Sequence, residues 1–243
     1  MNQLIDSFAF KASYSMVLII CSYYTYYFPA FSSKTADWFK SRYDPERAKI
    51  NLFLFQKILG FIMLGPVTAL LFYPFFSLNS SISIYSVYFQ VSPWSITAFL
   101  ILLIVILIYF SARKSDIYER VPHMRLKEWR LINILTSILG WGFYLLGYEF
   151  IFRQLLLFTW AEAFGIVPAI VVNVALYSAF HLPNGRKETV GSIFFGLVLC
   201  LVSLQSGSFV LAFLLHFTLS VSTEMFSIHH NPCMSFNLRR ATK

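Results

Sequence analysis

The octapeptide GYEFIFRQ, residues 147–154, sets an acid and a base inside a stretch apolar enough to cross a bilayer. Glu149 and Arg153 are four residues apart, so on a continuous helix they share a face and can pair. A charge at bilayer depth costs roughly 2.5–3.5 kcal/mol on insertion scales, so it persists where it pairs, lines a cavity or does chemistry. Three more ionisable residues lie in similarly apolar stretches of the second half: His181, His216 and Glu224. The function is therefore to be sought in this half of the chain.

The composition is that of a membrane protein. Of the 243 residues, 58% are hydrophobic and only 12% are charged, whereas soluble domains carry about 25% charged residues. Eight stretches approach the length needed to span the hydrocarbon core: Phe8–Phe28, Leu52–Phe76, Trp94–Ala112, Leu131–Glu149, Phe150–Phe164, Val167–Leu182, Thr189–Leu204 and Ser208–Ile228. We predict an all-α, polytopic helical membrane protein with about eight transmembrane or partly re-entrant helices around a hydrated cavity.

The net charge of +8 lies mainly in two connecting segments. The first holds Lys34, Lys40, Arg42, Arg47 and Lys49, and the second holds Arg113, Lys114, Arg120, Arg125, Lys127 and Arg130. The intervening loop, Leu78 to Ser92, has no basic residue. By the positive-inside rule, both basic segments are expected in the cytoplasm. The expected partner of these charges is anionic membrane lipid and not nucleic acid.

Composition divides the chain into three parts of one structural domain. Residues 1–130 hold the first helices and the cytoplasmic connections, residues 131–230 hold the buried polar groups, and residues 231–243 form a polar basic tail. Eight spans with both basic segments in the cytoplasm would place both termini outside, yet the tail carries Arg239, Arg240 and Lys243. The side of the membrane on which the chain ends is therefore left open at this stage.

Two further motifs complete the set of polar groups. His181 ends an apolar run just before the helix-breaking Pro-Asn-Gly, and Tyr177 lies one turn earlier on the same face. His216, Ser220 and Glu224 repeat at intervals of four residues, which makes a polar stripe on an otherwise apolar helix. Each motif alone is more typical of helix packing than of chemistry. Costly groups in three separate segments are harder to explain by packing.

The residue types permit two mechanisms of hydrolysis. In the first, Glu149 and an imidazole deprotonate a water that attacks a carbonyl, while another imidazole and a hydroxyl donate to the developing oxyanion. In the second, Glu149, His181 and His216 hold a divalent metal such as zinc. No H-E-x-x-H occurs in the sequence. The spacing gives the metal no independent support, so we favour the mechanism without a cofactor.

At these residues the chain resembles the intramembrane endopeptidases of the CAAX-protease and bacteriocin-processing (CPBP, or Abi) family, and is similar to type II CAAX prenyl endopeptidases. The family pattern is E-E-x-x-x-R, then F-x-x-x-H, then H-x-x-x-N. Its counterparts here are Tyr148-Glu149-x-x-x-Arg153, Tyr177-x-x-x-His181 and His216-x-x-x-Ser220. The resemblance implies peptide-bond hydrolysis in a membrane-associated peptide or protein, catalysed by Glu149, His181, His216 and Ser220 and supported by Arg153, Tyr148 and Tyr177. It also favours a multi-pass protein of a bacterial plasma membrane.

The chain departs from the family pattern at Tyr148, which replaces the glutamate usually assigned to water activation. A phenol with an unperturbed pKa near 10 is a poor base at neutral pH. Either Glu149 serves alone, or a nearby acid such as Glu188 or Glu224 substitutes, or the cavity binds without cutting. The rival functions are thus a non-catalytic binding, immunity or regulatory protein and, third, a small proton-coupled transporter.

Overall fold

The computed structural model describes residues 7–73, 91–118 and 120–237. Its helices are α2 (Phe8–Ala30), α3 (Ser33–Arg42), α4 (Pro45–Ile62), η1 (Met63–Val67), α5 (Thr68–Phe72), α6 (Pro93–Ser111), α7 (Ser115–Tyr118), α8 (Leu131–Glu149), η3 (Phe150–Leu157), α9 (Phe158–Phe164), α10 (Ile166–Phe180), η4 (Leu182–Asn184), α11 (Arg186–Ser206) and α12 (Val210–His230). Two short strands, β1 (Glu128–Trp129) and β2 (Ser235–Phe236), complete the fold.

Local sequence signals explain where several helices begin and end. The Ser7 hydroxyl accepts a hydrogen bond from the Phe10 amide, and the Asp44 carboxylate accepts one from the Arg47 amide. These side chains satisfy amide groups that a helix start leaves without intrahelical partners. Gly165 separates α9 from α10 at a φ of 87°. Glycine adopts such a backbone angle without steric cost, so the chain turns back sharply there.

The predicted all-α class is confirmed. Five described helical stretches are long and apolar enough to span a membrane: Pro45–Phe72, Pro93–Ser111, Leu131–Phe164, Arg186–Ser206 and Val210–His230. The α10 helix is apolar but shorter. Together they make the chain an integral, polytopic membrane protein. The loop predicted at 78–92 lies mostly outside the described residues, as do the end of the second predicted span and the basic residues of the tail.

One predicted boundary is wrong. The stretches Leu131–Glu149 and Phe150–Phe164 were expected as two helices, but α8, η3 and α9 form one continuous helix of 34 residues. Its middle part, η3, is a π-helix, which widens the helix without ending it. A hydropathy count divides the stretch because it is too long for one span of about 20 residues. The chain therefore reverses direction once less often than predicted.

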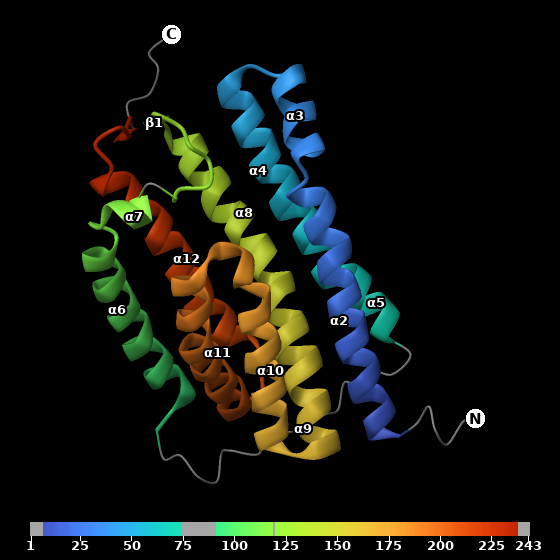
Figure 1. The fold of residues 1–243 in the computed structure, drawn as a ribbon. Coiled ribbons are helices and arrows are strands. Elements are labelled where there is room, and N and C mark those ends of the chain that lie inside the picture. The colour runs from blue at the N-terminus through green and yellow to red at the C-terminus, as the bar shows by residue number, and fades with distance from the viewer. Residues whose placement is uncertain (1–6, 74–90, 119, 238–243) are drawn as a thin grey trace.

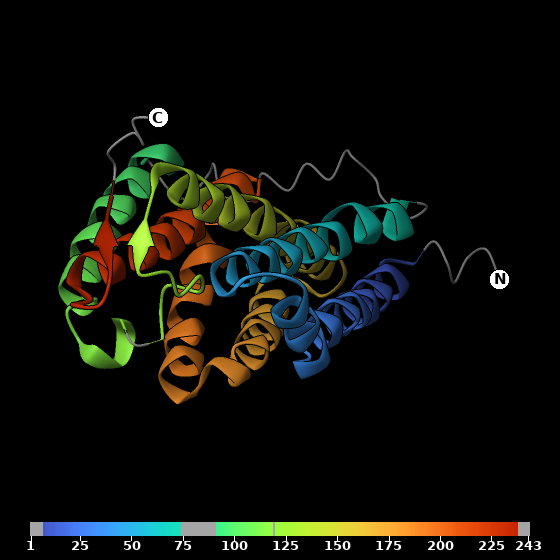
Figure 2. The same cartoon turned by 90° about the horizontal axis from the view of Figure 1, so that it is seen from above.

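The helices form a bundle whose two basic connections lie at the same end (Figure 1). The α3 helix and the segment from α7 to β1 both lie at the upper end in that view, and α12 also runs up to it. There β2 pairs in parallel with β1, as the adjacent arrows in Figure 2 show. The arrangement agrees with the predicted placement of both basic segments on one side. It also brings the chain past α12 to that side, which we call the basic end.

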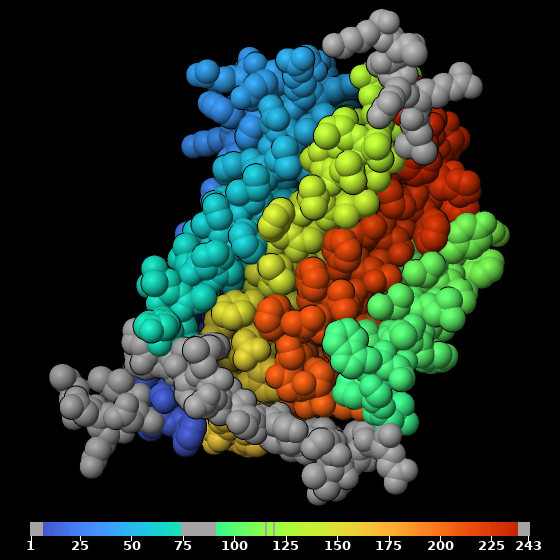
Figure 3. Space-filling view, turned by 180° about the vertical axis from the view of Figure 1, so that it is seen from behind, coloured from blue at the N-terminus to red at the C-terminus, as the bar shows by residue number. Residues whose placement is uncertain are grey.

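Four helices lie side by side on one face of the bundle. Figure 3 shows α4, α8, α12 and α6 as neighbouring stripes in that order, and α4–α8, α8–α12 and α12–α6 are all in contact. Close approach of α8 and η1 depends on small residues, since a Cβ at Gly147 would lie 3.1 Å from the Gly65 amide nitrogen. This packing fixes the position of α8 along η1 next to Glu149, the central residue of the candidate site.

Candidate active site

A buried carboxylate joins the middle of the long helix to α12. Glu149 Oε2 accepts a hydrogen bond from Arg153 Nε at 2.9 Å, and Glu149 Oε1 lies 2.5 Å from His216 Nδ1. Glu149 and Arg153 are 0% exposed and His216 is 7% exposed. Because an ionised carboxylate only accepts hydrogen bonds, Nδ1 of His216 is the donor in this pair. Arg153 thus balances the carboxylate charge while the carboxylate orients the imidazole.

His181 contacts the same two tyrosine rings as His216. It follows the last residue of α10, and its Nδ1 lies 2.8 Å from the Tyr177 carbonyl oxygen. Its ring centroid lies 4.6 Å from that of Tyr177 and 6.3 Å from that of Tyr148. The same two rings contact His216, at 6.0 and 5.9 Å. The structure therefore gathers both imidazoles around Tyr148 and Tyr177, with Glu149 bonded directly to one of them.

Tyr148 contacts both histidine rings. It is 3% exposed, and its ring packs 4.9 Å from Phe152 and 5.8 Å from Tyr177, measured between centroids. Its side chain therefore occupies the place beside Glu149 where the family pattern has a second carboxylate. The ring thus stands next to Glu149, whose carboxylate pairs with Arg153 and lies against His216.

Ser220 lies on α12 one turn beyond His216 and is half-buried. Within the described part of the chain its hydroxyl forms no hydrogen bond. The hydroxyl is therefore available to a substrate, and the helix spacing places it on the same face as His216.

Two residues of the site were not predicted from the sequence. Asn173 Oδ1 accepts a short hydrogen bond from Arg153 Nη1, and Asn173 Nδ2 donates to the Phe152 carbonyl at 2.6 Å. The Cys200 thiol lies 3.1 Å from Arg153 Nη1. Arg153 Nη2 is buried with no hydrogen bond to any described residue. A signal was present in the sequence, because Asn173, Tyr177 and His181 repeat at intervals of four on α10.

Glu224 belongs to a second polar cluster and not to the site. Its Oε1 accepts the backbone amide of His123 and lies 2.9 Å from His123 Nδ1, while its Oε2 accepts the Ser137 hydroxyl at 3.0 Å. The Lys57 ammonium lies 3.0 Å from the Trp141 ring centroid and interacts electrostatically with Glu224. Two further turns of α12 separate Glu224 from His216 and its oxygens are engaged elsewhere, so this packing does not favour the prediction that Glu224 substitutes for the missing glutamate.

Glu188 lies at the surface near the start of α11. Its carboxylate is 3.5 Å from an Arg120 guanidinium nitrogen, and both side chains are well exposed. The same guanidinium donates to the Asn184 carbonyl at 3.3 Å. Glu188 therefore helps to hold the loop that follows His181, and this contact does not favour the prediction that it acts as a substitute base.

The residues proposed as zinc ligands are not arranged as a metal site. Among the described residues, no three His, Cys, Asp or Glu side chains are grouped so that they could hold a metal ion. Both Glu149 oxygens are engaged, one by Arg153 and one by His216. The donor set does not fit zinc in this arrangement, and no step below is derived through a metal.

Fold and site together define a class: a polytopic helical membrane protein with a buried carboxylate, a guanidinium and two imidazoles around one aromatic wall. Residues 123–222 match the family model described as "Type II CAAX prenyl endopeptidase Rce1-like". This match confirms the resemblance found in the motifs: residues 123–222 are similar to that family. It covers every residue placed in the site above. Searches of curated proteins and of solved structures found no match.

Proposed function

We propose that the protein is an intramembrane peptidase that hydrolyses a peptide bond of a membrane-associated peptide or protein. The observation that carries this proposal is the Glu149–His216 hydrogen bond. It is buried away from water, joins α8 to α12 and lies beside a second imidazole. Burying a charged pair is costly and often stabilises a fold less than apolar packing would. A site that keeps four such groups together is better explained by chemistry than by stability.

In this proposal His181 takes the proton from water. A backbone carbonyl only accepts hydrogen bonds, so Nδ1 of His181 carries the proton that it donates to the Tyr177 carbonyl. Nε2 of the neutral ring is then an acceptor. As the water oxygen bonds to the scissile carbonyl carbon, its proton passes to Nε2. That proton is later delivered to the leaving nitrogen as the C–N bond breaks.

Glu149 has a different part from the one the sequence suggested. Both of its oxygens are engaged, so it orients His216 instead of binding the water. His216 with both ring nitrogens protonated, Nδ1 bonded to Glu149, and the Ser220 hydroxyl then donate to the carbonyl oxygen and stabilise the charge that develops there. The family's water-activating role at the first glutamate thus passes to His181, which is consistent with tyrosine at position 148.

The test is cleavage of a library of membrane peptides by purified protein in liposomes. Glu149→Gln and His181→Gln should each lower the rate by roughly a hundredfold to ten-thousandfold, the range for loss of a positioned general base or its support. Glu162→Gln and His229→Gln are matched controls, since both residues are exposed and Glu162 lies on the same long helix as Glu149. Both controls should cleave at the wild-type rate. Equal cleavage rates for all four variants would contradict the proposed mechanism.

A specific observation favours one other function, that of a non-catalytic binding protein. Tyr148 fills the place of a carboxylate with a packed ring, and a cavity walled in this way can hold a peptide without cutting it. This reading predicts that wild type cleaves no member of the library. It further predicts that a Glu149→Gln variant still restores the wild-type phenotype to a strain in which the gene is deleted.

A further inference from the structure

An open groove lies at the basic end, outside the site described above. It is formed where α3 folds against α4 and is lined by Lys34, Thr35, Trp38, Phe39, Tyr43 and Phe55. Four of these six residues are aromatic. Trp38 is 49% exposed and Tyr43 is 40% exposed. Exposure of such apolar ring surface to water is unfavourable. The α3 helix has no buried residue at all, which shows that it is not held there by a core of its own.

The charges around this groove are unevenly paired. Lys40 pairs with Asp37 at 3.1 Å, and Arg47 pairs with Asp44 at 3.3 Å. Lys34, which lines the groove, has no ion pair with any described residue. The Arg42 guanidinium lies over the Trp38 ring, 5.4 Å from its centroid, and likewise has no carboxylate partner among the described residues. Two uncompensated positive charges therefore flank an aromatic groove.

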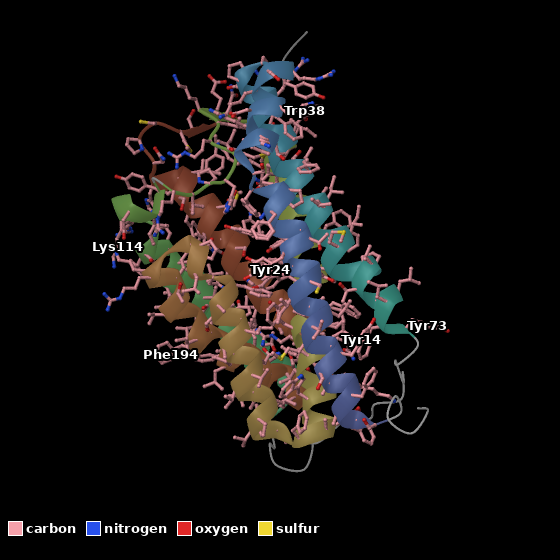
Figure 4. The ribbon with its side chains drawn as sticks, turned by 45° about the vertical axis from the view of Figure 1, so that its right-hand side comes forward. Tyr14, Tyr24, Trp38, Tyr73, Lys114 and Phe194 are labelled. Atoms are coloured by element: carbon pink, nitrogen blue, oxygen red, sulfur yellow. The ribbon has the colours of Figure 1, made fainter. Side chains whose placement is uncertain are left out.

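The groove lies where a bilayer would meet water. The α2 helix runs up to this end with Phe28 65% exposed, and Phe31 directly after it is 49% exposed. Figure 4 shows Trp38 on the outside of the molecule at the upper end, beyond Tyr24 of α2. Aromatic rings with basic residues close by are typical of the interfacial region of a bilayer. The groove thus opens to the level of lipid headgroups and upper acyl chains.

We propose that this groove binds one anionic phospholipid. The acyl chains lie along Trp38, Phe39 and Phe55, and the phosphate lies between Lys34 and Arg42. A zwitterionic headgroup would bring its own cation to the same two charges, so an anionic headgroup fits better. The proposal does not depend on peptidase activity, because none of its residues touches Glu149, His181 or His216.

Native mass spectrometry of the purified protein, mixed with phosphatidylglycerol or phosphatidylcholine, tests this proposal. Wild type should retain phosphatidylglycerol in preference. Lys34→Gln and Arg42→Gln should each weaken that retention about fivefold, the effect of one basic residue near an anionic surface. Trp38→Ala should weaken retention of both lipids. Lys114→Gln is the matched control for an exposed basic residue away from the groove (Figure 4), and Trp94→Ala is the matched control for an exposed indole.

Retention that is equal for both lipids in wild type would overturn the proposal. So would an equal loss in Lys114→Gln and Lys34→Gln, because the attraction would then come from the net charge of the surface. Competition by glycerol phosphate as strong as that of phosphatidylglycerol would show an anion site without a lipid site. Displacement of the lipid by a soluble peptide would assign the groove to a protein partner instead.

Discussion

Tyr148 decides how the chemistry of this site is divided among its residues. The ring contacts both imidazoles and its residue directly precedes Glu149, where a second carboxylate would add an unbalanced buried charge. A buried charge without a partner costs several kcal/mol even after local relaxation. At this position the chain has a packed ring and no carboxylate, so the proposed mechanism places the proton acceptor elsewhere. The proposed acceptor is Nε2 of His181, which forms no hydrogen bond with any described residue.

Tyr148→Phe separates packing from chemistry at this position. The variant keeps the ring and removes only the hydroxyl, so cleavage should stay within about threefold of wild type, well below the loss that follows removal of an acid–base group. Steady-state cleavage in liposomes is the measurement. A loss of a hundredfold or more with normal thermal stability would make the hydroxyl itself a catalytic group.

At the scale of the element, the π-helix η3 distinguishes the Glu149–Arg153 ion pair from one on a regular α-helix. A π-helix widens the turn and leaves backbone carbonyls without regular partners, which is why such segments often mark functional sites. Here the Phe152 carbonyl takes its hydrogen bond from Asn173 on α10. The same amide accepts from Arg153, so one side chain connects the irregular backbone to the group that holds Glu149.

Asn173→Leu should therefore disturb both stability and activity. It leaves the Phe152 carbonyl and one guanidinium nitrogen buried without this partner, at a cost of about 1–3 kcal/mol for each group. The thermal midpoint should fall by several degrees and cleavage should fall at least tenfold. Thermal unfolding in detergent and cleavage below the new midpoint are measured separately. Cys200→Ala is the control, because a thiol is a weak acceptor and its loss should change little.

An Asn173→Leu variant that is destabilised but cleaves normally well below its midpoint would show that Asn173 is structural only. A stable variant with normal activity would show that Arg153 needs no second support.

The helical elements could be predicted because hydropathy reports directly on burial in lipid. The exceptions have physical causes. The division at Phe150 failed because a π-helix continues the chain with no change in composition, and β1 and β2 escaped because two-residue strands depend on a partner over 100 residues away. In the site, the Glu149–Arg153 pair followed from helix spacing. The Glu149–His216 hydrogen bond, and the place of Glu224 in a separate cluster, depend on the packing of α8 against α12. Spacing within one helix does not predict that packing.

At the scale of the whole molecule, a second buried cluster ties the basic end together. Glu224 on α12 receives hydrogen bonds from Ser137 on α8 and from His123 in the preceding loop. Lys57 on α4 is 5% exposed and lies against the Trp141 ring. Four segments far apart in the sequence thus converge on one acid and one base, on the same helices that position Glu149 and His216.

Removing one member of this cluster should cost more than removing both. Glu224→Gln removes the carboxylate that accepts from His123 and Ser137 and that attracts the buried Lys57, so the free energy of unfolding should fall. Adding Lys57→Met should recover part of that loss, since no buried charge then lacks a partner. Thermal unfolding of the two single variants and the double variant gives the coupling. Strictly additive losses would contradict a direct interaction between Lys57 and Glu224.

The central claim is that water, activated beside Glu149 and its two histidines, breaks a peptide bond inside the membrane. The most direct measurement is mass spectrometry of peptides released in liposomes made up in oxygen-18 water. The account predicts that wild type releases fragments whose new carboxylate carries one heavy oxygen, and that Glu149→Gln releases none above background. Unlabelled fragments, no fragments from wild type, or equal labelled release by both proteins would contradict it.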